Sequence, residues 1–268
     1  MTNAMTNSMT NPMSDINQQM FDFALVPVVT LSDAARAVGL GEALTEGGLP
    51  VAEITLRSAA GIDGIREIAK NCPDVLVGAG TVLSVDQAKA SADAGARFVV
   101  TPGFAEPVVA WCLKNDMPIY PGISGTEGIE MARAHGLSVV KFFPAEQAGG
   151  IPMLKALSAP YQSMRFMPTG GIGLGNVNDY LALPCVVACG GSWLAAKGAI
   201  ASGDFASITA TVRASLRQVY GCAIGPDGIE IGVTSLERTR AYLKRNGASV
   251  TTDDGSASIG PTTVVFRP

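Results

Sequence analysis

The sequence predicts an α/β fold and, within that class, a (β/α)8 TIM barrel with a small C-terminal extension. From residue 24 onward, short β-branched runs alternate with Ala-rich segments of helical period. Eight strands, each followed by a helix, within about 200 residues match the size and order of such a barrel. A doubly wound sheet is the alternative, but its nucleotide-binding glycines follow the first strand, whereas the glycine-rich run at residues 170–175 follows the seventh.

The element boundaries follow from where the two patterns switch. Strands are expected at residues 25–31, 51–56, 75–82, 98–102, 118–123, 139–143, 165–169 and 185–189. Helices are expected at residues 33–47, 59–71, 85–94, 105–115, 126–135, 150–158, 175–182 and 204–219. We therefore expect a barrel domain over residues 20–221.

The two ends of the chain break this rhythm. Residues 1–19 repeat Met-Thr-Asn and are expected to form a disordered tail. Residues 222–268 indicate a β-α-β-β extension, with strands at 228–233, 248–252 and 262–267, a helix at 235–245 and a turn at 253–256. A unit of this size is too small to be robust alone, so we expect it to pack on the barrel or on a partner subunit.

The composition predicts a cytoplasmic protein that binds neither nucleic acid nor a membrane. Hydrophobic residues make up 47% of the chain and charged ones 16%, which is enough to bury a large core. The net charge of −4 argues against a nucleic-acid or anionic-membrane surface. No apolar run approaches the roughly 20 residues that span a bilayer. The first basic residue, Arg36, comes too late for a signal peptide.

Cysteine and histidine usage predicts neither a metal nor a cofactor. The five cysteines are odd in number and form no CxxC pair, which indicates reduced, mostly buried thiols. The single histidine, His135, precedes a glycine at an expected helix end, where it is more simply a surface residue than a catalytic one. A zinc site needs more ligands of these types than the chain offers.

Lys141 stands in a short apolar run that ends at Pro144. Side chains alternate along a strand, so if Val140 and Phe142 pack under the helices, Lys141 enters the barrel lumen. Burial disfavours the ammonium form, as does a nearby cation such as Arg57, and a neutral amine is what attacks a carbonyl to form a Schiff base. Alternatively, the Lys141 side chain could extend out to a loop. The aromatic residues that follow Lys141 directly in the sequence make this interpretation less favoured.

Strands two and three supply polar partners for that amine. Glu53, Thr55 and Arg57 share one strand face, and because the outer face of a barrel strand is apolar, Glu53 and Arg57 are expected in the lumen. They form either a structural ion pair or part of a site. Two glycines before Thr81 allow a close approach to the backbone or mark a bulge. In a site, Glu53 would move protons, Arg57 would hold a carboxylate and Thr81 would add a hydroxyl contact.

Glycine pairs follow strands seven and eight. Thr169-Gly170-Gly171 and Gly190-Gly191-Ser192 would expose successive backbone N–H groups, and barrels commonly hold phosphate at this place. One pair alone would indicate only a turn. Together with Lys141, the two pairs predict imine chemistry on a phosphorylated oxo compound.

Five motifs in this order resemble the KDPG/KHG aldolase family, the class I 2-dehydro-3-deoxy-6-phosphogluconate aldolases. The resemblance covers about residues 20–220 and rests on residues 53–57, 77–82, 141–146, 168–172 and 190–194. It implies Schiff-base cleavage of the phosphorylated 2-keto acid to pyruvate and glyceraldehyde 3-phosphate in the Entner–Doudoroff pathway, without a metal. It further implies a homotrimer. The extension after residue 222 is not part of the family pattern.

The resemblance also implies a role for each matching residue. Lys141 forms the Schiff base and Glu53 is the acid and base. The implied substrate-binding residues are Arg57 and Thr81 at the carboxylate, Phe143 beside the imine, Pro27 on strand one, and Thr169, Gly170, Gly171, Gly191 and Ser192 around the phosphate.

Alternatives stay open at this point. Within the family, the substrate could be the galactonate epimer or 4-hydroxy-2-oxoglutarate. The glycine pairs alone would also suit a phosphate-binding barrel isomerase or epimerase, which leaves Lys141 without a role. A non-catalytic sensor of phosphorylated sugar acids would bind ligand without releasing pyruvate.

Overall fold

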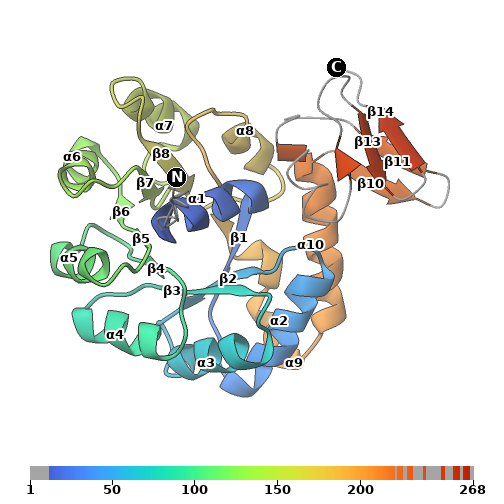
Figure 1. Cartoon of the computed structure of the whole chain (residues 1–268), viewed down its shortest axis with the longest axis horizontal. Coiled ribbons are helices and arrows are strands. Elements are labelled where there is room, and N and C mark those ends of the chain that lie inside the picture. Colours follow the sequence, from blue (N-terminus) through green and yellow to red (C-terminus); the bar gives the residue numbers. More distant parts are fainter. Residues whose placement is uncertain are drawn as a thin grey trace, which may run out of the picture.

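The computed structural model describes residues 12–220 continuously and, beyond them, residues 222–225, 228–231, 238–239, 249–250, 256–259 and 262–265. Up to residue 220 the strands lie inside and most helices lie around them (Figure 1). The strands are β1 Leu25–Val29, β2 Val51–Thr55, β3 Leu76–Gly80, β4 Val99–Val100, β5 Ile119–Tyr120, β6 Gly122–Ile123, β7 Val139–Phe142, β8 Arg165–Pro168 and β9 Cys189–Gly191.

These strands form a curled parallel arrangement in two sheets. The six-stranded sheet has the order β5-β4-β3-β2-β1-β9 and the three-stranded sheet has the order β6-β7-β8. Two isolated parallel bridges, Phe166 to Val186 and Thr169 to Gly190, connect β8 with the segment of β9. Pro121 separates β5 from β6, and its carbonyl accepts from the Lys141 amide at 2.9 Å. The α/β fold with parallel strands is confirmed.

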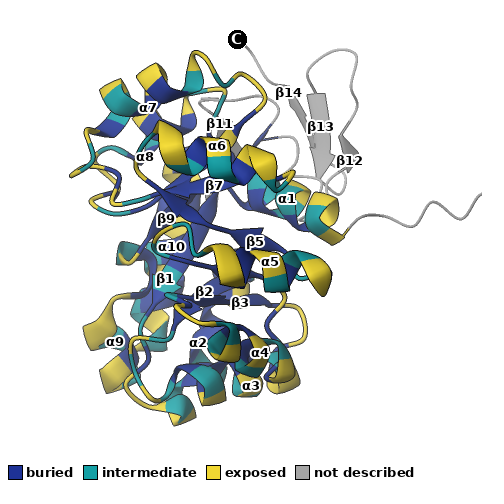
Figure 2. Ribbon diagram, turned by 90° about the vertical axis from the view of Figure 1, so that its left-hand side faces the viewer, coloured by how far each residue is buried: buried dark blue, intermediate teal, exposed yellow. Residues whose placement is uncertain are grey.

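The helices agree with the predicted sequence order to within a few residues at most ends. They are α2 Ala37–Glu46, preceded by the 3-10 turn η1 Ala34–Arg36, then α3 Gly61–Asn71, α4 Val85–Asp93, α5 Glu106–Lys114, α6 Thr126–Ala134, α7 Gly150–Ser158, α8 Val177–Leu181, α9 Lys197–Ser202 and α10 Phe205–Tyr220. The strands and the inner helix faces are buried, whereas the outer helix faces are exposed (Figure 2). The short helix α9 was not predicted.

The N-terminal helix α1, Pro12–Phe23, corrects the prediction of a disordered tail for residues 12–19. Ile16, Met20 and Phe23 are buried and follow the i, i+4, i+7 spacing of one helix face. The Tyr120 hydroxyl on β5 donates to the Asn17 side chain at 2.9 Å. The polar repeat hid this stripe, because the buried residues begin only after it. Residues 1–11 lie outside the described residues.

Strand eight is shifted from its predicted place. Residues 185–188 hold only the bridge at Val186, and β9 begins at Cys189. The shift follows from the pairing with β1, whose first residue, Leu25, lies opposite Cys189. The glycines that were expected after the strand, Gly190 and Gly191, are therefore its last two residues.

The described parts of the extension differ from a β-α-β-β unit. β10 Cys222–Gly225 and β11 Gly228–Ile231 form an antiparallel pair, and β12 Ser249–Val250, β13 Ser256–Ile259 and β14 Thr262–Val265 form an antiparallel sheet. Strands β10 and β13 were not predicted, and β13 begins at the last residue of the expected turn. Most of the expected helix at 235–245 lies outside the described residues.

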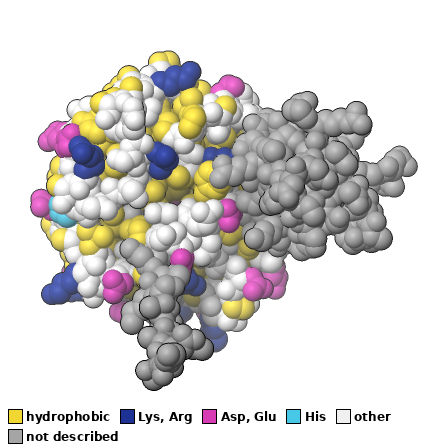
Figure 3. Space-filling view, turned by 45° about the horizontal axis from the view of Figure 1, so that its top comes forward, with side chains coloured by type: hydrophobic (Ala, Val, Ile, Leu, Met, Phe, Trp, Pro, Cys, Tyr) yellow, Lys and Arg dark blue, Asp and Glu magenta, His cyan; other side chains and the backbone are white. Residues whose placement is uncertain are grey.

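The surface carries side chains of mixed type (Figure 3). On the face in Figure 3, basic and acidic side chains are interspersed between hydrophobic and other groups. Within the described part of the chain, no helix is both long and apolar enough to cross a membrane.

Because α1 is packed, we expect Met20→Ala to lower the free energy of unfolding by about 2–4 kcal/mol, since the side chain is fully buried. Urea unfolding measures this loss, and Ser14→Ala on the exposed face of the same helix is the control. Equal stability of the two variants would mean that α1 does not pack as described.

Candidate active site

Lys141 and Glu53 form a buried ion pair between β7 and β2. The Lys141 Nζ lies 3.0 Å from Glu53 Oε1 and 3.4 Å from Oε2. The side chains are 6% and 1% exposed. The prediction that both side chains point inward is confirmed, because strand alternation holds at each of them. Buried charged groups of this kind are found paired, and each of these two side chains is the partner of the other.

Gly80 on β3 makes the room that Glu53 occupies. Glu53 pairs with Gly78 in register, and a Cβ at Gly80 would lie 2.3 Å from Glu53 Oε1. A side chain at Gly80 would therefore displace the carboxylate from Lys141. The sequence left two explanations for this glycine, a bulge or a close approach of another group to the backbone. The structure shows a close approach, that of the Glu53 side chain.

The loop after β3 holds Thr81 in a left-handed conformation, with φ of 57°. Such a conformation is costly for a non-glycine residue and often occurs at functional sites. The Ser84 hydroxyl accepts from the Gln87 amide at 3.2 Å, and the Gln87 side chain accepts from the Leu83 amide at 2.7 Å. This reciprocal cap of α4 fixes the loop that carries Thr81.

Arg57 lies beyond the end of β2, in the turn that follows it, and its side chain is exposed. Strand alternation stops at Thr55, so the expectation that Arg57 enters the lumen beside Lys141 is wrong. A carboxylate, not a guanidinium, is the closest charged partner of the Lys141 amine. Arg57 lies at the carboxyl end of β2, where its guanidinium N–H groups could bind a ligand above the ion pair.

A pair of hydroxyls that the sequence did not single out ties β1 to β2 below Arg57. The Thr55 hydroxyl donates to the Val29 carbonyl at 2.9 Å and lies 2.8 Å from the Thr30 hydroxyl. Because the Thr55 proton is already used, Thr30 is the donor in the second bond. The alternation that placed Glu53 inward also applied to Thr55 and could have found it.

Phe143 and Pro27 contact different parts of the predicted site. The Lys141 Nζ is 5.2 Å from the centroid of the Phe143 ring, which is a cation–π distance. Pro27 is buried in β1 in register with Gly191 of β9. Phe143 thus borders the amine, and Pro27 borders the glycine pair after strand eight.

The two glycine pairs come together at the ends of β8 and β9. Thr169 is 5% exposed and bridges to Gly190. Gly170 and Gly171 have left-handed φ values of 103° and 76°, which favour glycine. Ser192 is exposed and precedes the 3-10 turn η2, Trp193–Ala195. The two glycine pairs therefore form a contiguous rim of backbone at these strand ends, where the sequence predicted a phosphate cradle.

The loop after Lys141 supports this rim. The Ala145 amide donates to the Thr169 carbonyl at 2.8 Å, and the Glu146 amide donates to the Gly170 carbonyl at 3.1 Å. The Tyr180 hydroxyl donates to the Glu146 carboxylate. Burial, together with this hydrogen bond, raises the pKa of Tyr180, so its proton stays in place. Lys141 and the cradle are thus connected through one loop.

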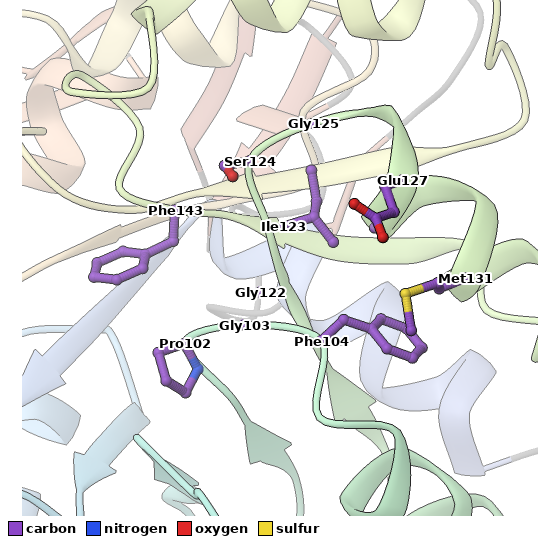
Figure 4. A pocket seen from close by; sticks show the side chains of 11 residues that line it. Pro102, Gly103, Phe104, Gly122, Ile123, Ser124, Gly125, Glu127, Met131 and Phe143 are labelled. Carbon is purple, nitrogen blue, oxygen red and sulfur yellow. The ribbon is translucent and has the colours of Figure 1, made fainter.

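A cavity of about 280 Å³ opens beside Phe143, between the loops after β4 and β6. Figure 4 shows Phe143 on one side and Phe104 with Met131 on the other, with Ile123 between them. Neither member of the ion pair lines it. This cavity was not predicted from the sequence.

His135 has a structural environment. It caps the end of α6, its Nδ1 lies 2.9 Å from the Met131 carbonyl, and its ring lies 5.6 Å from that of Phe104. Among the described residues, no group of three or more His, Cys, Asp or Glu side chains could hold a metal.

Comparisons with known proteins agree with this geometry. The model of the KDPG and KHG aldolase family matches residues 16–211. The 2-dehydro-3-deoxy-phosphogluconate aldolase of Treponema pallidum is 50% identical over 195 residues, which are 73% of this chain and 93% of the relative. The KHG/KDPG aldolase of Escherichia coli is 42% identical over 70% of this chain and 89% of its own length.

A solved structure adds a chemical state of a relative. The KDPG aldolase from Legionella pneumophila, with pyruvate captured as a covalent carbinolamine intermediate, is 36% identical with a TM-score of 0.72. The match covers 74% of this chain and 97% of that one. This chain belongs to the KDPG and KHG aldolase family.

Proposed function

We propose that this chain is a class I aldolase that cleaves 2-dehydro-3-deoxy-6-phosphogluconate to pyruvate and D-glyceraldehyde 3-phosphate. The observation that carries the proposal is the buried amine of Lys141, 3.0 Å from a carboxylate and at the same strand ends as a glycine cradle. An isomerase or epimerase would need the cradle but not a buried lysine. The carbinolamine formed by the Legionella relative supports covalent chemistry at this site.

The ion pair explains how the reaction starts. Proton transfer from Lys141 to Glu53 over 3.0 Å yields a neutral amine and a neutral acid. The amine adds to C2 of the substrate, and water leaves with the proton that Glu53 returns, which gives a protonated imine. The imine is the electron sink for the next step.

Cleavage then uses the freed carboxylate. Glu53 takes the proton of the C4 hydroxyl, the C3–C4 bond breaks, and its electrons move into the imine to form an enamine. The aldehyde leaves, Glu53 returns the proton to C3, and water hydrolyses the pyruvyl imine. Arg57 and Thr81 hold the carboxylate, Phe143 borders the imine, and Thr169, Gly170, Gly171, Gly191 and Ser192 hold the phosphate, with Pro27 behind them.

Three substrates are to be compared directly. The name of the Escherichia coli relative includes KHG, which favours testing 4-hydroxy-2-oxoglutarate beside the gluconate-derived substrate and its galactonate epimer. Turnover on the three assigns the C4 preference and the contribution of the phosphate.

We further propose that the strands close into an eight-stranded barrel over residues 20–221, with residues 222–268 as an appended unit. The bridges from β8 to β9, the pairing of β9 with β1, and the hydrogen bond from Lys141 to Pro121 support the closure. In this arrangement β5 and β6 are one strand interrupted at a proline.

We also propose a cytoplasmic homotrimer. Four described cysteines are free thiols, in keeping with a reducing compartment, and Leu83, 62% exposed, offers an apolar contact to a partner subunit. Sedimentation equilibrium at several concentrations should give three times the chain mass, and Leu83→Ser should weaken the association. A monomer at all concentrations would contradict the trimer without affecting the chemistry.

Covalent trapping tests the chemistry. Pyruvate with borohydride should add a reduced pyruvyl group to the peptide that contains Lys141, because reduction fixes the imine. Lys141→Met should abolish the adduct, and Lys155→Met, at an exposed lysine on α7, should leave it unchanged. A folded wild-type protein without an adduct would exclude the aldolase reaction.

Gly80→Ala tests the placement of Glu53. The new Cβ would push the carboxylate away from Lys141, so we expect kcat to fall about a hundredfold while the protein stays folded. Steady-state kinetics and thermal unfolding measure the two quantities. Gly198→Ala on α9 is the control, because nothing lies within 4 Å of its Cβ. Full activity of Gly80→Ala would mean that Glu53 is not held by this contact.

A further inference from the structure

Arg238 lies in the part of the chain that follows the family match, yet it contacts the aldolase domain. Its side chain is 5% exposed. Nη1 donates to the Val187 carbonyl at 2.9 Å and Nη2 donates to the Val186 carbonyl. The guanidinium lies 4.6 Å from the centroid of the Phe21 ring of α1. One side chain therefore joins the extension, α1 and the segment that leads into β9.

Neighbouring contacts hold Arg238 in place. The Thr239 hydroxyl donates to the carbonyl of Tyr220, the last residue of α10, at 3.1 Å. The Tyr220 hydroxyl in turn donates to the Asp22 carbonyl of α1 at 2.7 Å. The cluster is therefore built from several elements and does not depend on a single bond.

The Val187 carbonyl lies where the pairing between β8 and the segment of β9 changes register. The Phe166 amide donates to the Cys185 carbonyl at 2.7 Å, and the Val187 amide donates to the Phe166 carbonyl at 2.9 Å. Phe166 lies opposite Val186, but Thr169 lies opposite Gly190, so the segment of β9 has one extra residue between the two bridges. Pro168, which lies in this interval on β8, has no N–H to donate, and the Val187 carbonyl accepts from Arg238.

The Val186 carbonyl lacks a strand partner for a different reason. Counting back from the register of Leu25 with Cys189 puts Val186 opposite Asp22, which belongs to α1. A helical residue cannot continue the ladder. The second guanidinium nitrogen of Arg238 fills this place as well.

The segment held by Arg238 continues directly into the cradle. β9 begins two residues after Val187, Gly190 bridges to Thr169, and Gly191 lies opposite Pro27. We propose that Arg238 is a positioning residue for the phosphate cradle: the C-terminal extension holds the start of the strand whose end binds the phosphate. The proposal rests on the phosphate site of the proposed function and assigns a role in that site to the extension.

The test compares a phosphorylated substrate with an unphosphorylated one. Arg238→Met keeps the length of the side chain and removes the donors. We expect the KM for 2-dehydro-3-deoxy-6-phosphogluconate to rise roughly tenfold, because a displaced cradle binds phosphate poorly. The kcat/KM for 4-hydroxy-2-oxoglutarate should change less than about twofold, and the borohydride adduct at Lys141 should remain. Arg238→Lys should raise the KM less than Arg238→Met does. If Arg238→Met does not fold, Arg238→Lys is the variant that tests the proposal.

Two further variants make the outcomes distinguishable. Arg213→Met is the matched control, because Arg213 also donates to a backbone carbonyl, that of Glu46 at 3.1 Å, but lies on the surface of α10. Ser192→Ala tests the cradle itself. If Ser192→Ala leaves the preference for the phosphorylated substrate unchanged, the proposed phosphate site is wrong. If Ser192→Ala lowers that preference and the Arg238 variants do not, or if they lower activity on both substrates equally, the positioning role is wrong.

Discussion

The buried ion pair of Lys141 and Glu53 is the interaction on which the arrangement of the strand ends depends. Removing one partner of such a pair costs about 3–5 kcal/mol, because the other charge stays buried without compensation. The pair joins β7 and β2, which belong to different sheets. β7 and β2 must therefore place these residues at a similar depth in the interior, so that the Lys141 amine and the Glu53 carboxylate meet. In the proposed reaction, the substrate takes the Lys141 amine into a covalent bond, which frees the Glu53 carboxylate for proton transfer.

A similar need for close approach explains glycines at the ion pair and at the rim. Gly80 leaves space for the Glu53 carboxylate, Gly171 leaves space for the Glu146 side chain, and Gly191 lies where a Cβ would overlap the Trp193 ring. In each case the missing side chain is replaced by a group from another element. Gly171 and Gly191 thus let the supporting loop and η2 pack directly against the rim.

The orientation of a side chain was predicted correctly from the sequence where the residue lies within a regular strand. Alternation placed Lys141 and Glu53 correctly, because both lie within strands, but it failed for Arg57, since β2 ends two residues earlier. The stripe of α1 was present in the sequence at residues 16, 20 and 23, and the polar repeat before it obscured it. The contacts of Arg238 follow from tertiary pairing alone, so no local pattern could have predicted them.

Pro168 links these observations. Pro168, the last residue of β8, has no N–H, and the pairing of β8 with the segment of β9 changes register between the bridges at Phe166 and Thr169. The carbonyl on the neighbouring segment still needs a hydrogen bond, since buried backbone groups are rarely left unpaired. In this chain the donor comes from residue 238, far along the sequence. The register change therefore lies between the glycine pairs at one end of β9 and the attachment of the extension at the other.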